Sequence, residues 1–218
     1  MMAGTISALR YQKRNKNRVN VYLDDQFAFG LAAIEAARLR VGQVLSDDDI
    51  ARLRRQDDVE RAHERALNFL SYRPRSEAEV RRNLRKKDVT DEAIEAVVER
   101  LTRAGMLDDR EFARYWVENR LQFNPRGARA LGHELREKGV PVSVIDDTLV
   151  GFDEEPTARK AAEAGARRLA HLEPTAFRRR LGAYLARRGF SYAVISPLVE
   201  EMLDAAGSEA VSDIESEG

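Results

Sequence analysis

The chain of 218 residues contains no cysteine. Disulfides, thiolate-bound metals and cysteine nucleophiles are therefore excluded, and the absence of cysteine fits a reducing compartment. Histidine is also scarce: His63, His133 and His171 lie far apart in the sequence and share no metal-ligand spacing. We therefore expect no metal site.

Several motifs that carry enzyme chemistry are missing as well. There is no glycine-rich phosphate loop and no nucleophile elbow, so nothing indicates nucleotide binding or acyl transfer. Paired acids do occur, and we assign them to turns, helix caps and solvated helix surfaces rather than to acid–base catalysis. These pairs are Asp24-Asp25, Asp57-Asp58, Asp108-Asp109 and Asp146-Asp147. We expect a protein that is not an enzyme and needs no cofactor.

Long hydrophobic runs and an excess of one charge are absent too. No apolar run approaches twenty residues, and the first residues lead into no signal-peptide core, so we expect no membrane span, no export signal and a cytoplasmic location. The 37 basic residues balance the 37 acidic ones. With 43% hydrophobic and 34% charged residues, the chain is typical of folded units with highly charged surfaces, not of a disordered protein.

The chain does contain a repeat of about fifty residues, present three times. The same position of each copy holds a proline: Pro74, Pro125 and Pro174. A leucine follows ten or eleven residues later: Leu84, Leu135 and Leu185. Each copy then continues with a basic residue and an apolar stripe at helical spacing. Repetition at a fixed period is typical of helical arrays whose units pack on their neighbours. We predict a mainly α-helical, elongated array of three three-helix units.

The array is preceded by a predicted β meander. Thr5–Tyr11, Arg18–Leu23 and Gln26–Phe29 alternate apolar and polar residues, with polar turns between them. The predicted units are a β meander with one or two helices, three three-helix repeats and a disordered acidic tail. They occupy residues 1–57, 58–107, 108–155, 156–205 and 206–218, respectively.

Two helix boundaries are predicted from local signals. Ser46 followed by acids is an N-cap, and we expect one helix from there to about Gln56 and another from Val59 to Ser71. Pro197 lacks a backbone N–H, so the last helix of the third copy is expected to begin near Ser196 or to bend there.

Basic residues gather around the second helix of each copy. A solvated helix face explains each cluster alone, but recurrence at the repeat period favours binding to a polyanion or a regular polymer. The candidate partner-binding residues are Arg73, Arg75, Arg81, Arg82, Arg85, Lys86, Lys87, Arg126, Arg129, Lys138, Arg178, Arg179, Arg180, Arg187 and Arg188. The candidates for DNA contact at the N-terminus are Arg10, Lys13, Arg14, Lys16 and Arg18.

Aromatic residues lie beside the N-terminal cations. Tyr11, Tyr22, Phe27 and Phe29 are candidates for stacking on bases, but for Phe27 and Phe29 we favour packing in the core. We also assign Phe112 and Trp116 to the core.

Several stretches resemble a known family, the RecX regulatory proteins of bacteria. The first is Ser71–Val80 followed by Leu84 and Lys87. The second is Gly105–Ala113 followed by Trp116 and Arg120, and the third is Gly127 with Leu131, Glu134-Leu135 and Lys138-Gly139-Val140. The stretch Tyr11–Leu31 is similar to a strand-bearing extension of some members.

The resemblance covers roughly residues 5–205 and implies a function. Such proteins consist of tandem three-helix units that bind the RecA recombinase and its filament on single-stranded DNA. They lie in the filament groove, suppress ATP hydrolysis and strand exchange, and favour filament shortening or disassembly. The resemblance implies a cytoplasmic protein without cofactor or catalytic residues. We expect a monomer whose direct contact with single-stranded DNA is weak.

Two other functions stay open. A stand-alone DNA-binding protein of helix-turn-helix-like units would place the last helix of each unit in the major groove. Asp91, Glu92, Glu95 and Glu99 argue against this function, because acids on that helix of the first copy would face phosphates. The second alternative is a helical scaffold that binds another protein.

The predicted elongation can be measured in solution. A compact globule of this length has a radius of gyration of about 17 Å. We expect small-angle X-ray scattering to give a clearly larger value, because an array of small units does not close on itself. A value close to that of the globule would contradict the elongated array.

Overall fold

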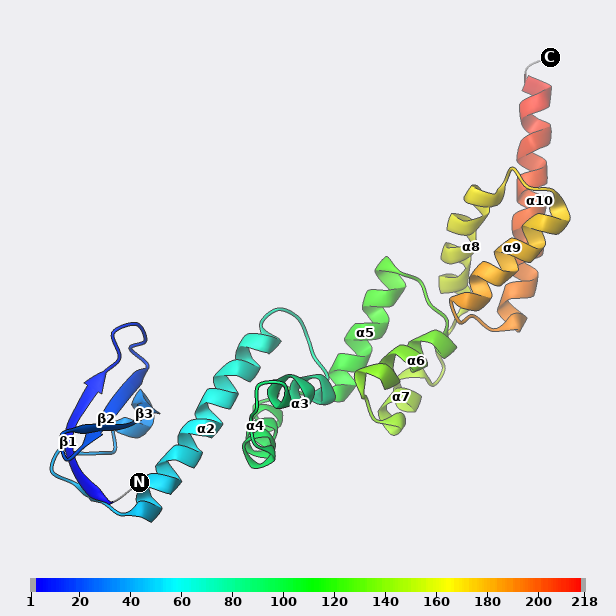
Figure 1. Ribbon diagram of the computed structural model, residues 1–218. Coiled ribbons are helices and arrows are strands. Elements are labelled where there is room, and N and C mark those ends of the chain that lie inside the picture. Colours follow the sequence, from blue (N-terminus) through cyan, green and yellow to red (C-terminus); the bar gives the residue numbers. More distant parts are fainter. Residues whose placement is uncertain (1–2, 217–218) are drawn as a thin grey trace. The chain divides into compact units, whose positions relative to one another are not determined.

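The structure is a computed structural model that describes the backbone of residues 3–216 and the side chains of residues 3–205. The chain divides into two compact units, Met1–Leu107 and Asp108–Gly218 (Figure 1). The predicted fold class, a mainly helical chain with an N-terminal antiparallel sheet and three three-helix units, is confirmed.

The first unit begins with a four-stranded antiparallel sheet in the order β3-β2-β1-β4. Its strands are β1 (Gly4–Tyr11), β2 (Arg18–Leu23), β3 (Gln26–Ala32) and β4 (Val44–Leu45). The first three correspond to the predicted strands. Sequence reasoning missed β4, because its two residues are too few to show alternation. Asp24 and Asp25 adopt positive φ angles of 46° and 68° and form the tight turn between β2 and β3.

Of the two phenylalanines assigned to this core, only Phe29 is buried. Phe27 is 60% exposed, so its assignment to the core was wrong. The cause is an irregularity in the β2–β3 register, where Val21 pairs with Phe29 but Tyr22 pairs with Phe27. The extra residue shifts the alternation, and Phe27 packs edge-on against Tyr22 instead.

The sheet packs on a short helix, α1 (Ala33–Ala36), and on a long one, α2 (Asp47–Leu70). The predicted break between Gln56 and Val59 was wrong, since α2 is one helix of 24 residues. No proline or glycine lies within it. Its predicted capping signal is present, because Ser46 and Asp49 form a capping box.

Asp57 lies in the middle of α2 and is only 5% exposed, so its assignment to a turn or surface was wrong. Its carboxylate accepts bonds from Nη1 and Nη2 of Arg18 at 3.0 and 2.8 Å. It also accepts the backbone N–H of Ala32 at 2.9 Å. Asp57, where the local sequence predicted a break in the helix, therefore binds α2 to β2 and to the end of β3 through these hydrogen bonds.

The C-terminal half of α2 packs with α3 (Glu77–Arg85) and α4 (Asp91–Arg103) in the first three-helix unit. Ser76 and Glu79 form the predicted capping box of α3, and Thr90 caps α4. The buried core includes Ala66, Leu84 and Val97.

The second three-helix unit consists of α5 (Asp109–Phe123), α6 (Ala128–Lys138) and α7 (Val142–Leu149). Phe112 and Trp116 lie in its core, as predicted, and Trp116 is 9% exposed. The indole N–H of Trp116 donates to Oε2 of Glu134 at 2.8 Å. The Arg120 guanidinium and the Lys138 ammonium lie 4.1 and 4.7 Å from the ring centroid.

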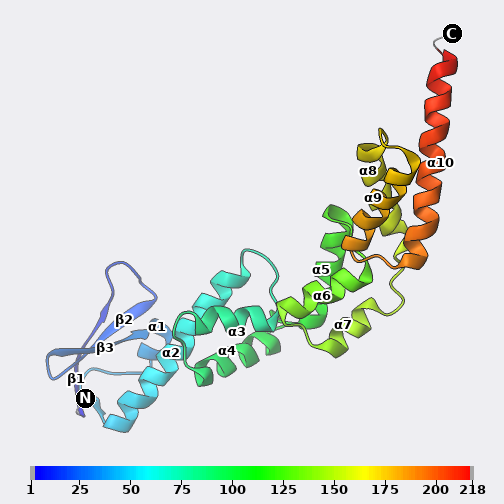
Figure 2. The same ribbon diagram turned by 45° about the vertical axis from the view of Figure 1, so that its right-hand side comes forward.

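The third three-helix unit consists of α8 (Glu155–Leu169), α9 (Pro174–Arg187) and α10 (Tyr192–Ser216), with α8 and α9 packed on α10 (Figure 2). We predicted that α10 begins near Ser196 or bends there. The start near Ser196 was wrong, because the Ser191 carbonyl already accepts N–H bonds from Val194 and Ile195, and the bend stays a prediction. Pro197 lies within the helix.

The backbone of 206–216 continues α10, where we predicted a disordered tail. Alanine is the best helix former, and this segment follows Ala205 with further alanines. Residues 217–218 of the predicted tail lie outside the described residues.

The second and third repeats join through a close backbone contact, which we call the 127–189 junction. The Gly127 N–H donates to the Arg188 carbonyl at 3.0 Å. A Cβ on Gly127 would lie 2.3 Å from the Gly189 carbonyl oxygen. Gly189 has a φ of +85°, which favours glycine. The Glu154 carboxylate accepts the backbone N–H groups of Ala128 and Ser191 at 2.7 and 2.9 Å.

Candidate functional site

In the first repeat, several predicted partner-binding arginines connect parts of the protein itself. Arg73 makes two hydrogen bonds to Glu79, the shorter 2.8 Å long. Arg81 bonds Glu77 of its own helix at 2.7 Å and Glu95 of α4 through Nη2 at 3.0 Å. The bonds to Glu95 raise the pKa of Arg81 above its usual range. The acidic face of α4 is thus partly neutralised by arginines from α3.

Two more cations of this repeat also have internal contacts. Arg85 donates to Asp91 at 3.1 Å. The Arg75 guanidinium stacks 4.0 Å from the centroid of the Phe69 ring, and its partial burial lowers the pKa of Arg75. Arg82, Lys86 and Lys87 are exposed. Lys86 and Lys87 have no ion pair among the residues that the structure describes.

The predicted partner-binding residues of the second repeat all make contacts within the second compact unit, Asp108–Gly218. Arg126 lies 3.5 Å from the Glu134 carboxylate, and Lys138 covers the Trp116 ring. Arg129 donates to the Ala186 carbonyl at 2.9 Å and so bridges to the third repeat.

Of the N-terminal candidates for DNA contact, two make contacts inside the protein and three are exposed. Arg18 is bound to Asp57, and Arg10 lies over the Tyr22 ring at 5.0 Å. Lys13, Arg14 and Lys16 are exposed in the loop between β1 and β2.

In the third repeat, two candidates have structural contacts. Arg178 forms a two-pronged pair with Glu200 of α10, with Nη2 and Oε2 2.9 Å apart. This pairing raises the pKa of Arg178 and lowers that of Glu200. Arg188 donates to Asn124 Oδ1 and the Pro125 carbonyl at 3.0 and 2.9 Å, and it belongs to the 127–189 junction.

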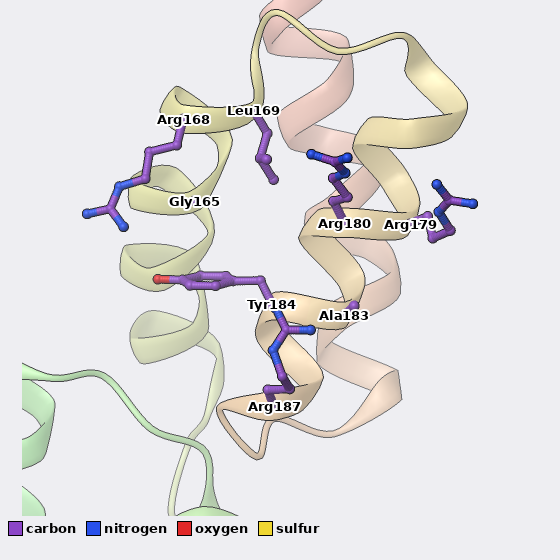
Figure 3. A pocket seen from close by; sticks show the side chains of 8 residues that line it. All are labelled: Gly165, Arg168, Leu169, Arg179, Arg180, Ala183, Tyr184 and Arg187. Carbon is purple, nitrogen blue, oxygen red and sulfur yellow. The ribbon is translucent and has the colours of Figure 1, made fainter.

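The remaining third-repeat candidates line a cavity of about 470 Å³ between α8 and α9 (Figure 3), which we call the α8–α9 cavity. Its lining residues are Gly165, Arg168, Leu169, Arg179, Arg180, Ala183, Tyr184 and Arg187. The lining residues therefore include four arginines and no acidic residue. Leu169, Ala183 and the Tyr184 ring supply its apolar surface.

The packing of the two helices forms this cavity. Tyr184 extends from α9 toward α8 beside Gly165 (Figure 3). A Cβ on Gly165 would lie 2.8 Å from Leu181 Cδ1 and 3.1 Å from the Tyr184 ring. Glycine at this position allows the close approach of α9. Arg168 is absent from the candidates predicted from the sequence. The sequence signal for this close packing is Gly165, a glycine within an alanine-rich helix.

The described residues give no sign of a metal centre or a membrane span. In the part of the chain that the structure describes, no three histidine or acidic side chains gather closely enough to hold a metal ion. Within the same part, no helix combines the length and apolar character needed to cross a bilayer.

Four RecX family models match the chain in order. They are the Regulatory protein RecX N-terminal domain at residues 4–46 and the first, second and third three-helix domains of RecX. The three-helix models match residues 62–101, 108–149 and 153–199.

Relatives and solved structures agree with this match. Regulatory protein RecX of Bacillus licheniformis is 35% identical over 201 residues, which cover 90% of this chain and 76% of the relative. That of Bacillus subtilis is 35% identical over 202 residues with the same coverage. A crystal structure of regulatory protein RecX has 28% identity and a TM-score of 0.74, covering 91% of this chain and 99% of the other. RecX from Lactobacillus salivarius has 25% identity and a TM-score of 0.61, covering 67% of this chain and 97% of the other.

Proposed function

The chain belongs to the RecX family of bacterial regulatory proteins, and from this premise we propose that it binds the RecA recombinase and its filament on single-stranded DNA. There it inhibits ATP hydrolysis and strand exchange and so modulates recombinational DNA repair in the cytoplasm. The observation that carries the proposal is the ordered match of all four RecX domains along one chain. The relatives are named regulatory proteins, which supports a role without catalysis.

The proposed mechanism is the addition of several weak contacts. Three similar units in one chain offer similar surfaces to a polymer of identical subunits. Once one unit is bound, the others find their sites at high effective concentration, so the total affinity exceeds that of any single contact. A ligand that binds one conformation of the filament more tightly than another shifts the filament toward that conformation.

The contacts within the protein reduce the set of basic residues that we propose for binding the filament. Arg81, Arg178 and Arg188 hold helices or repeats together, so changing them would disturb the fold as well as any interface. Lys86 and Lys87 in the first repeat and Arg179, Arg180 and Arg187 in the third are exposed instead. We assign the contact with the filament, which consists of recombinase and single-stranded DNA, to these five side chains.

The proposal is tested by the ATPase activity of RecA on single-stranded DNA. We expect saturating amounts of the full chain to suppress most of the ATP hydrolysis. The double variant Lys87→Glu/Arg187→Glu should lose most of the inhibition, because it reverses one exposed cation in each of two repeats. Hydrolysis is followed by release of ADP in a coupled assay.

The matched control is Arg40→Glu/Arg61→Glu. It reverses two exposed arginines outside the assigned contact, so the change in net charge is the same. The control should inhibit like the unaltered chain. An unaltered chain that leaves RecA hydrolysis unchanged would refute the proposed function, and equal inhibition by both variants would refute the assigned contact.

A further inference from the structure

We propose that the α8–α9 cavity binds single-stranded DNA directly, with phosphates on its arginines and a base or sugar against its apolar floor. The inference rests on the proposed function, because single-stranded DNA is the polymer on which the partner filament is built. It goes further by naming the part of the chain that contacts the nucleic acid.

The first argument is the state of the cations. Arg168, Arg180 and Arg187 are exposed, and within the described residues none of them forms an ion pair. Their neighbour Arg178 differs, since it is paired with Glu200. Unpaired like charges around one cavity repel each other and create a positive potential that an anion relieves.

The second argument is the arrangement of these cations. Arg180, Tyr184 and Arg187 lie on one stripe of α9, and the two arginines are seven residues apart, or about 10 Å along the helix axis. Arg168 lines the cavity from α8, and its guanidinium extends outward on the side of α8 away from α9 (Figure 3). Cations spaced along α9 and a further cation on α8, all beside one cavity, suit a chain of phosphates better than a single anion.

The third argument is the size and the lining of the cavity. A volume of about 470 Å³ lies within the range of small-molecule sites and is larger than one carboxylate requires. The apolar surface of Leu169, Ala183 and Tyr184 gives a base or sugar a place beside the phosphate-binding groups. The Arg188 guanidinium already covers one face of the Tyr184 ring at 4.6 Å, so the base contacts the floor without stacking on that face.

The fourth argument is the choice of arginine. The cations of the lining are all arginines. A guanidinium group binds phosphate through two parallel hydrogen bonds and also stacks on bases, which an ammonium group does not do. Nucleic acid therefore uses both properties of this lining, whereas an acidic peptide uses only the charge.

The test is binding of the full chain to a dye-labelled oligothymidylate, followed by fluorescence anisotropy at several salt concentrations. The test variant is Arg168→Ser/Arg180→Ser, which removes one cavity arginine from each helix. The matched control is Arg61→Ser/Arg167→Ser, which removes an exposed arginine of α2 and the arginine next to Arg168 on α8, both outside the lining. Circular dichroism must show equal helical content in all three proteins.

We expect the test variant to bind on the order of tenfold more weakly at low salt, and the magnitude of its salt slope to fall by about 1.4, since each single-strand phosphate contact contributes about 0.7. The control should bind within about twofold of the unaltered chain, the scatter expected of surface changes. Equal binding by both variants, or no binding by the unaltered chain, would overturn the inference.

Two further measurements locate the ligand and identify its class. An oligonucleotide carrying 5-bromodeoxyuridine should photo-crosslink to the α8–α9 segment, and crosslinks confined to other segments would overturn the inference. A labelled polyglutamate peptide should bind more weakly than the oligonucleotide. Tighter binding of the peptide would assign the cavity to an acidic protein segment instead.

The two proposals fail in different assays. If the unaltered chain leaves RecA hydrolysis unchanged but binds oligothymidylate through Arg168 and Arg180, the proposed function fails and the cavity assignment stands. If the chain inhibits RecA but the test variant binds the oligonucleotide normally, only the cavity assignment fails.

Discussion

Gly127→Ala is expected to destabilise the unit that contains the second and third repeats by about 3 kcal/mol, at the upper end of overpacking effects. The added Cβ would lie 2.3 Å from the Gly189 carbonyl oxygen and 2.5 Å from the Phe190 nitrogen. Both are backbone atoms, so no side-chain rotation relieves the clash. The 127–189 junction must then open, which breaks the hydrogen bond from the Gly127 N–H to the Arg188 carbonyl.

The effect is measured by urea unfolding and by hydrogen exchange of the α9 amides. Gly182→Ala is the matched control, because the nearest atom to a Cβ there is 4.0 Å away, in Ile195. Alanine within a helix is favoured over glycine by roughly 0.8–1.0 kcal/mol, so the control should be neutral or slightly stabilising. Equal unfolding midpoints for the two variants would contradict the close contact at the junction.

Asp57→Ala is expected to cost about 3–5 kcal/mol, the usual loss when one partner of a buried ion pair is removed. The change leaves the partly buried Arg18 guanidinium without its carboxylate, and it removes the acceptor of the Ala32 N–H. The β2 and β3 amides should then exchange far faster, because the sheet loses its polar attachment to α2.

Asp58→Ala is the matched control, since Asp58 follows on the same helix but is exposed. It should change stability by no more than about 0.5 kcal/mol. Replacing the pair together, as Arg18→Met/Asp57→Leu, should cost less than Asp57→Ala, because no buried charge is left unpaired. If the β2 and β3 amides exchange at the same rates in Asp57→Ala and Asp58→Ala, Asp57 does not attach the sheet to α2.

The fold was predictable wherever the signal was local or periodic. The fifty-residue period gave three helical units, alternation gave three strands, and Ser76 with Glu79 marked the start of α3. The continuity of α2 was not predictable, because Asp57 resembles part of a turn until its partner Arg18, 39 residues earlier, is placed beside it. The exposure of Phe27 depends on a register irregularity that alternation alone does not show.

The candidate site was predictable only as a set of basic clusters. The sequence could not separate structural arginines from exposed ones, since the partner acids lie on other helices. Arg81 pairs with Glu95, 14 residues away, and Arg178 with Glu200, 22 residues away. The α8–α9 cavity depends on the close packing of Tyr184 beside Gly165, which becomes visible only when both helices are placed.

The enclosed indole of Trp116 has a spectroscopic consequence. It is the only tryptophan of the chain, and it sits between a carboxylate acceptor and two cations in the second repeat. Its intrinsic emission therefore comes from one place, and opening of that repeat exposes the ring to water and shifts the emission to the red. Fluorescence excited at a wavelength that tryptophan absorbs and tyrosine does not therefore reports on the middle repeat alone, and the sheet and the third repeat contribute no signal.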